Sequence, residues 1–186
     1  VLTELALYLA SLRESISGSD CEVAVDALSR LPGLIEQLQD LNVECGRLAK
    51  FIGRHDHLLY LGRGSLYPIA LEGALKMKEV AYLHAEGYAA GEMKHGVNAL
   101  ISDAMPTIVI APTGRLYEKM VSNVNEVKAR GGHVTALISK GDDNLSSICD
   151  EVLEMPTAPE LIAPMLALVP LQLLAYHVSV ARGHDP

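Results

Sequence analysis

The sequence contains no tryptophan and a single phenylalanine, so aromatic side chains contribute little to any core that it forms. Hydrophobic residues nevertheless make up 49% of the chain, enough for a core built from aliphatic side chains. With 186 residues, the chain is long enough for one well-buried domain and an appendage, and short for two complete domains.

Cysteines are also few and widely spaced. Cys21, Cys45 and Cys149 lie far apart, and no two of them have the Cys-x-x-Cys spacing. A disulfide framework or a structural zinc site needs ligands that are closer together or more numerous. We therefore expect reduced cysteines, no metal site and no cofactor.

Positive charge is scarce. The chain has 15 Lys and Arg against 23 Asp and Glu, which gives a net charge of -8, and its basic residues are scattered. The phosphates of a nucleic acid would be repelled by such a surface. We expect no nucleic-acid partner.

No uninterrupted hydrophobic run has the length of a membrane span. The most apolar window, residues 161–181, contains two prolines, Gln172 and His177, which are costly in lipid. We expect a buried helix there, no membrane contact and a cytoplasmic protein. The chain also lacks an initiator methionine, which suggests a fragment of a longer protein.

The first 53 residues predict helices and connections only. Apolar residues recur at helical spacing, and a first helix is expected to end near Ser15. Ser19 or Asp20 then caps a second helix. Pro32 is expected to open a new helical turn, and Gly53 to end the helical region.

From residue 54 onward, short apolar runs alternate with helical patterns. The runs expected to form strands are 57–62, 107–112, 133–139 and 151–156. Such an alternation predicts an α/β fold, a three-layer αβα sandwich around a mostly parallel sheet. Residues 1–53 are then a helical connecting segment, and residues 54–186 form the domain.

Glycines follow the first expected strand in the loop Gly62-Arg63-Gly64-Ser65. Ligands of open α/β sheets bind beyond the carboxyl ends of the strands, and a helix N-terminus suits an anion. The loop therefore either binds an anion or only turns the chain into the next helix. The sequence leaves both interpretations open.

Charged residues are concentrated among small apolar ones in residues 70–101. Glu72, Lys76 and Glu79 are spaced to share one helix face. An exposed ladder of ion pairs is one interpretation. Because the rest of this helix is also apolar or small, we instead expect it to be buried nearly all round, with a glutamate tuned for proton transfer.

Two further features of this region suggest a site. Gly73 in the middle of a helix costs about 1 kcal/mol relative to alanine, which predicts close contact with another element. His95 follows Glu92 and Lys94 on an expected bend, and imidazole is suited to acid–base work near neutral pH. A structural histidine is the alternative, but we expect a site shared with the helix of Glu79.

These residues carry a family resemblance. LEGALKMKEVAYLHAEGYAAGEMKHG (residues 71–96), YLGRGSLYPIALEG (60–73) and VPLQLLAYHVSVARGHD (169–185) resemble the second SIS (sugar isomerase, flavodoxin-like) domain of the glutamine–fructose-6-phosphate aminotransferases. The resemblance extends from about Leu58 to the end of the chain. It implies that residues 1–53 are the last helix of a first SIS domain and the connection between the two domains.

The resemblance also implies a reaction and its residues. The family makes glucosamine 6-phosphate from fructose 6-phosphate and glutamine-derived ammonia, moving a proton between C1 and C2 of the sugar. It implies that Glu79 is the base, that Lys76 lies by the sugar, and that His95 assists ring opening in the neighbouring subunit of a homodimer. Val97-Asn98 stands where the family commonly has Pro-Leu, which affects how His95 is held.

Other parts of the family's enzymes have no counterpart here. The glutaminase domain, the first SIS domain with its Ser/Thr-rich phosphate loop and the basic C-terminal tail find no match, so the fragment is expected to be inactive alone. The alternative function is a stand-alone SIS module that binds a phosphosugar for regulation. Retention of both Glu79 and His95 favours the enzyme, since a sensor needs neither.

Overall fold

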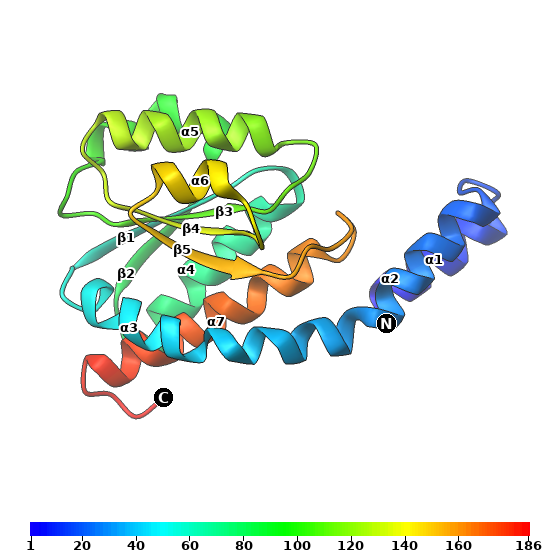
Figure 1. Ribbon diagram of the computed structural model, residues 1–186, viewed down its shortest axis with the longest axis horizontal. Coiled ribbons are helices and arrows are strands. Elements are labelled where there is room, and N and C mark those ends of the chain that lie inside the picture. The colour runs from blue at the N-terminus through cyan, green and yellow to red at the C-terminus, as the bar shows by residue number, and fades with distance from the viewer.

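The computed structural model describes all 186 residues (Figure 1). The helices are α1 (Leu2–Leu12), α2 (Gly18–Gln37), α3 (Asn42–Ile52), α4 (Tyr67–Ala81), α5 (Tyr117–Ala129), α6 (Asp143–Ile148) and α7 (Ala163–Ala181). The strands are β1 (His57–Gly62), β2 (His84–Ala89), β3 (Thr107–Ala111), β4 (Val134–Ser139) and β5 (Glu151–Met155). Short 3₁₀ helices are η1 (Leu38–Leu41), η2 (Gly64–Leu66), η3 (Ala90–His95) and η4 (Val97–Leu100).

The strands form one five-stranded sheet in the order β2-β1-β3-β4-β5, and all neighbouring strands are parallel. Helices α3, α4 and α7 cover one face, whereas α5 and α6 cover the other (Figure 1). The predicted α/β three-layer sandwich is confirmed.

Each face of the sheet has its own apolar core. Leu58 and Tyr60 of β1 belong to a cluster of 28 buried residues that includes α3, α4 and α7. Leu59 and Leu61 belong to a cluster of 15 that includes α5 and η3. This division follows from the alternation of side chains along a strand. The sheet therefore separates the molecule into two independent packing layers.

Strand β2 at the sheet edge was missed by sequence reasoning. Its sequence, HAEGYA, has no β-branched residue and therefore gives little strand signal. Gly87 lies where α4 crosses the strand, and a Cβ there would be 2.6 Å from the Cα of Leu71. At Gly87, the close approach of the helix thus requires glycine, although glycine has a low strand propensity.

The prediction that Pro32 opens a new turn is wrong. Helix α2 begins after Ser17, whose Oγ accepts a hydrogen bond from the backbone N–H of Asp20, and continues through Pro32 to Gln37. Proline removes one helical hydrogen bond. Leu28, Leu31, Leu34 and Ile35 pack against the core on both sides of it, which compensates for this loss.

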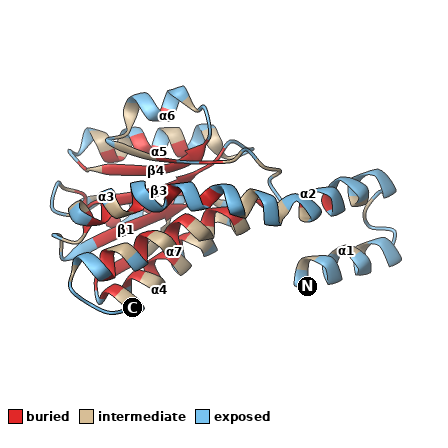
Figure 2. Ribbon diagram, turned by 60° about the horizontal axis from the view of Figure 1, so that its bottom comes forward, coloured by how far each residue is buried: buried red, intermediate tan, exposed pale blue.

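The helices before β1 divide into two parts. Helix α1 has no buried residue and projects from the body of the protein with the first half of α2 (Figure 2). Helix α3 instead contributes four buried residues, Cys45, Leu48, Ala49 and Ile52, to the core against α7. The connecting segment thus ends as part of the sandwich.

Helix α7 is long and apolar enough to cross a membrane, with a mean hydropathy of 1.5. It packs against both α3 and α4, and half of its most apolar window is buried. Leu166, Leu171, Leu174 and Val178 are fully enclosed in the larger core. The predicted core helix is thus present between two other helices.

Close packing of α4 on the sheet depends on Gly73, as predicted. A Cβ at this position would be 2.9 Å from the ring of Tyr60 in β1 and 2.9 Å from Leu171 in α7. Such contacts are too short for real carbon atoms, and the Tyr60 ring is fully buried, so neither neighbour has room to move.

We predict that Gly73→Ala lowers the free energy of unfolding by about 1–3 kcal/mol, since overpacking outweighs the gain in helix propensity. Gly33→Ala is the matched control, because Gly33 lies inside α2 and a Cβ added there would have no other atom within 4 Å. The control should gain up to about 1 kcal/mol. Urea denaturation of both variants measures the difference, and equal shifts would contradict the packing described.

His133 is half-buried and directly precedes β4. Its ring lies 4.2 Å from that of Phe51, and its Nδ1 is buried without a hydrogen-bond partner. Burial lowers the pKa of His133 below its usual 6.5, although Asp150 and Glu151 act to raise it. The folded state therefore favours the neutral imidazole.

A histidine with a depressed pKa binds fewer protons in the folded than in the unfolded state, so stability falls as the pH drops below 6.5. We predict that His133→Phe flattens this fall between about pH 7 and 5. His57→Gln, at an exposed position, should retain it. Denaturation midpoints against pH test the assignment, and identical profiles for wild type and His133→Phe would contradict it.

Candidate functional site

The charged face of α4 holds a hydrogen-bonded ion pair. Lys76 Nζ donates to Glu79 Oε2 at 2.6 Å and lies 3.5 Å from Glu72 Oε1. The hydrogen bond to Glu79 raises the pKa of Lys76, which keeps the ammonium charged. One oxygen of Glu79 is held by this bond, and the other forms no hydrogen bond or ion pair. The structure thus brings Lys76 and Glu79 together as expected.

The prediction that α4 is buried nearly all round is wrong. Ala70, Ala74, Met77 and Ala81 are buried against the sheet and α7. The opposite face is open: the Glu79 side chain is 50% exposed, and two leucines beside it, Leu71 and Leu75, are also exposed. Small residues form the packed face of α4. Leucines also occur on its open face, and for this reason the sequence predicted burial on every side.

A shallow hollow lies beside this ion pair, between α4 and α7. Glu72 and Lys76 line it from α4, Tyr176 lines it from α7, and Pro186 brings the end of the chain to the same place. Tyr176 is half exposed. The hollow combines a cation, a carboxylate and an aromatic ring at the surface of the larger core.

His95 lies apart from this ion pair. It ends η3, its side chain is 73% exposed, and its Nε2 is 3.7 Å from Glu92 Oε2. Segment η3 packs through Ala90 and Met93 into the smaller core, on the sheet face opposite to α4. The expected site shared by His95 and the helix of Glu79 therefore does not form within one chain.

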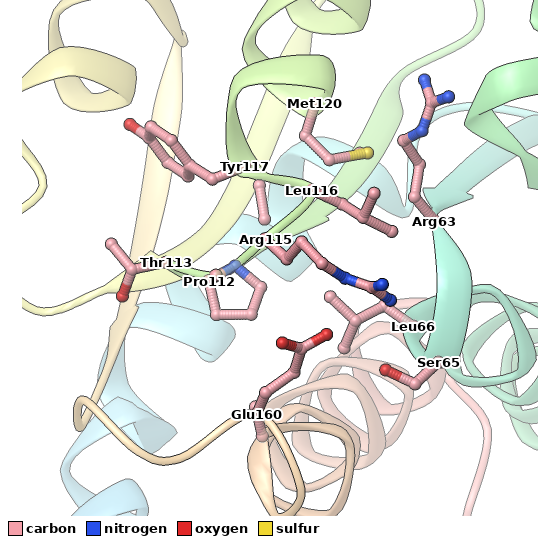
Figure 3. A pocket seen from close by; sticks show the side chains of 13 residues that line it. Arg63, Ser65, Leu66, Pro112, Thr113, Arg115, Leu116, Tyr117, Met120 and Glu160 are labelled. Carbon is pink, nitrogen blue, oxygen red and sulfur yellow. The ribbon is translucent and has the colours of Figure 1, made fainter.

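A deeper crevice opens where β1 and β3 end (Figure 3). The turn after β1 has Gly64 at φ +56°, a conformation that favours glycine. Ser65, Arg115 and Glu160 present polar groups at the crevice, and Arg63 turns its guanidinium away from them (Figure 3). This crevice lies at the edge where open α/β sheets bind ligands.

Sequence reasoning found the loop at this crevice but missed Arg115 and Glu160. Both follow other strands, and no local motif connects them with residues 62–65. Nowhere in the structure are three His, Cys, Asp or Glu side chains grouped so that they could hold a metal ion. The polar groups available are suited to binding hydroxyl and phosphate oxygens.

Comparison with known proteins identifies relatives along the whole chain. Residues 51–182 match the model of the SIS domain. The chain is 48% identical over 185 residues to glutamine–fructose-6-phosphate aminotransferase [isomerizing] of Bacteroides thetaiotaomicron, which covers all of this chain and 30% of that relative. The chain therefore spans about a third of the length of the curated relatives it matches.

Solved structures agree with this result. The C-terminal domain of glucosamine-fructose-6-phosphate aminotransferase from Francisella tularensis matches with a TM-score of 0.93 and 35% identity, over 99% of this chain and 52% of that one. A structure described as a putative phosphosugar isomerase from Silicibacter pomeroyi matches with a TM-score of 0.74 and 27% identity, over 88% of this chain and 48% of that one. From the domain match, the identity along the whole chain and the shared fold, we conclude that this chain belongs to the SIS domain family.

Proposed function

We propose that this chain is the second SIS domain, with its helical connection, of a glutamine–fructose-6-phosphate aminotransferase. The observation that carries the proposal is 48% identity over the whole chain to such an enzyme, together with a paired Lys76 and Glu79 on an open helix face. We place the boundary between the connection and the domain at residues 53 and 54. The complete enzyme, a cytoplasmic protein, converts fructose 6-phosphate and glutamine-derived ammonia to glucosamine 6-phosphate.

Glu79 is the base that moves a proton between C1 and C2 of the sugar. A carboxylate suits this step because it accepts a proton from carbon and returns it to the neighbouring carbon without leaving the site. Lys76 supports the proposal by holding one oxygen of Glu79 at 2.6 Å, which orients the other towards a substrate. Its ammonium also stabilises negative charge that develops on the sugar oxygen.

His95 acts on the sugar bound by a second copy of the chain. The two-layer packing supports this assignment, since α4 and η3 lie on opposite faces of one sheet. A substrate over Glu79 is thus better placed to meet an imidazole from another subunit. The homodimer that results has two equivalent sites, each built from both chains.

Exposed apolar side chains around Glu79 support a covered site in the complete enzyme. Leu71 and Leu75 of α4, Tyr82 at its end and Tyr176 of α7 are each at least 40% exposed. Apolar groups at this density are typical of surfaces that contact other protein. The first SIS domain and the second subunit would remove water from the site, and the first SIS domain and the glutaminase domain would supply phosphate binding and ammonia.

We predict that Glu79→Gln in the full-length enzyme lowers sugar isomerisation by about 10²–10⁴-fold, because an amide cannot accept the proton. Glutamine hydrolysis should be retained. Glu72→Gln is the matched control, on the same face of the helix and also near Lys76, and should keep both activities. Separate assays of amino-sugar formation and glutamate release measure the two; equal loss of both in Glu79→Gln would contradict the role of the base.

Mixing two inactive variants tests the action of His95 across subunits. Mixed dimers of Glu79→Gln and His95→Asn should contain one site with both native groups, so random exchange restores roughly a quarter of wild-type activity. If both groups acted within one chain, every site in the mixture would lack one of them. No recovery after verified subunit exchange would therefore contradict the shared site.

A further inference from the structure

A second polar hollow lies between η3 and α5, on the sheet face opposite to Glu79. It is lined by Arg63, Lys94, Lys119, Ser122, Asn123 and Glu126, and no hydrophobic side chain contributes to it. Neither Lys76 nor Glu79 takes part in it. The hollow has three basic side chains and one carboxylate, in a protein whose net charge is -8. The hollow is therefore locally positive, although the chain as a whole is negatively charged.

Arg63 is held in place without a charged partner. Its Nη1 donates to Asn123 Oδ1 at 2.9 Å, and it forms no ion pair with any carboxylate. Gly91 of η3 lies against the guanidinium, so that a Cβ there would be 3.0 Å from Nη2. The guanidinium is therefore fixed by an amide and a backbone wall, and its remaining N–H groups are available to an anion.

Asn123 lines the hollow and carries a second N–H donor group. The residue is only 6% exposed, and its Oδ1 is occupied by Arg63. Its amide nitrogen has no acceptor among the hydrogen bonds of the structure, yet it is not enclosed by protein. An accessible N–H donor without a protein acceptor is free to donate to a ligand or to water. The hollow thus contains an open position for an acceptor.

Glu126 does not cancel the positive charge at the opening. One carboxylate oxygen binds the Lys94 ammonium at 3.0 Å, and the other is enclosed by protein without a partner. Lys119 forms no ion pair and is exposed at the rim. An incoming ligand therefore meets N–H donors from Arg63, Asn123 and Lys119, a set that accepts phosphate oxygens and rejects cations.

We propose that this hollow is a second, non-catalytic binding site for a phosphorylated sugar. Arg63, Asn123 and Lys119 bind the phosphate, and the polar walls contact sugar hydroxyls. A nucleotide fits less well, because no aromatic or aliphatic side chain is present to stack against a base. Since η3 forms one wall and ends at His95, occupancy of the hollow also holds the segment that carries this histidine.

Calorimetric titration of the protein at its natural length with fructose 6-phosphate tests the proposal. The double variant Arg63→Gln/Lys119→Gln removes two donors to the phosphate. We expect it to lower the affinity of one class of binding sites for fructose 6-phosphate by about 10–100-fold, as for the loss of hydrogen bonds to a charged group. Glu79→Gln should retain that class. Lys119→Gln alone, at an exposed position, should weaken it without disturbing the fold.

Controls separate a built site from general electrostatic attraction. Lys78→Gln/Lys140→Gln removes the same charge outside the hollow and should leave binding unchanged. Inorganic phosphate and adenosine monophosphate should compete only weakly, whereas fructose should not compete. Unchanged binding in Arg63→Gln/Lys119→Gln, or the same loss in the control pair, would overturn the site. Equal affinity for inorganic phosphate and fructose 6-phosphate would overturn the assignment of a sugar.

Discussion

The close approach of α4 to the sheet is the constraint on which the rest of the structure depends. Gly73 leaves the space that the Tyr60 ring fills, and Gly87 of β2 allows the backbone of α4 to pass over the edge strand. These contacts place the glycine side of the helix against the sheet. Lys76 and Glu79, on the far side of the same helix, are consequently held outward together, with 2.6 Å between ammonium and carboxylate. The Lys76–Glu79 pair is thus positioned by two glycines, which have no side chain of their own.

The sheet also limits how the two groups that we propose for catalysis can be combined. Glu79 belongs to the layer of α3, α4 and α7, and His95 belongs to the layer of α5 and η3. Five paired strands lie between these layers and exclude a direct contact through the core. A reaction that needs both groups therefore favours assembly of two chains, and the exposed apolar residues beside Glu79 are consistent with such an assembly. The same division leaves the α5 layer free to carry the second polar hollow.

Sequence reasoning predicted the features that repeat along the chain and missed those that depend on contacts distant in sequence. Runs such as 107–111 and 134–139 are continuous and apolar because both faces of the strand are buried, so they were recognised. Strand β2 was not recognised, because α4 passes close to it at Gly87 and this contact requires a glycine, which gives no strand signal. Pro32 was predicted to open a new helical turn because proline favours the first turn of a helix. Packing of α2 against the core overrides this preference, and the helix continues through Pro32. The pairing of Lys76 with Glu79 followed from helical spacing, but the exposure of Glu79, the separation of His95 and the donors of Asn123 have no local signal.

The structure of the natural-length enzyme with bound fructose 6-phosphate would show directly whether Glu79 reaches the sugar. We expect the free carboxylate oxygen of Glu79 to lie roughly 3–3.5 Å from C1 or C2 of the sugar, a distance from which proton transfer can begin. We also expect an imidazole that reaches the same sugar to come from a second chain. A sugar bound elsewhere, with the Glu79 carboxylate left in bulk water, would contradict the role proposed for Glu79.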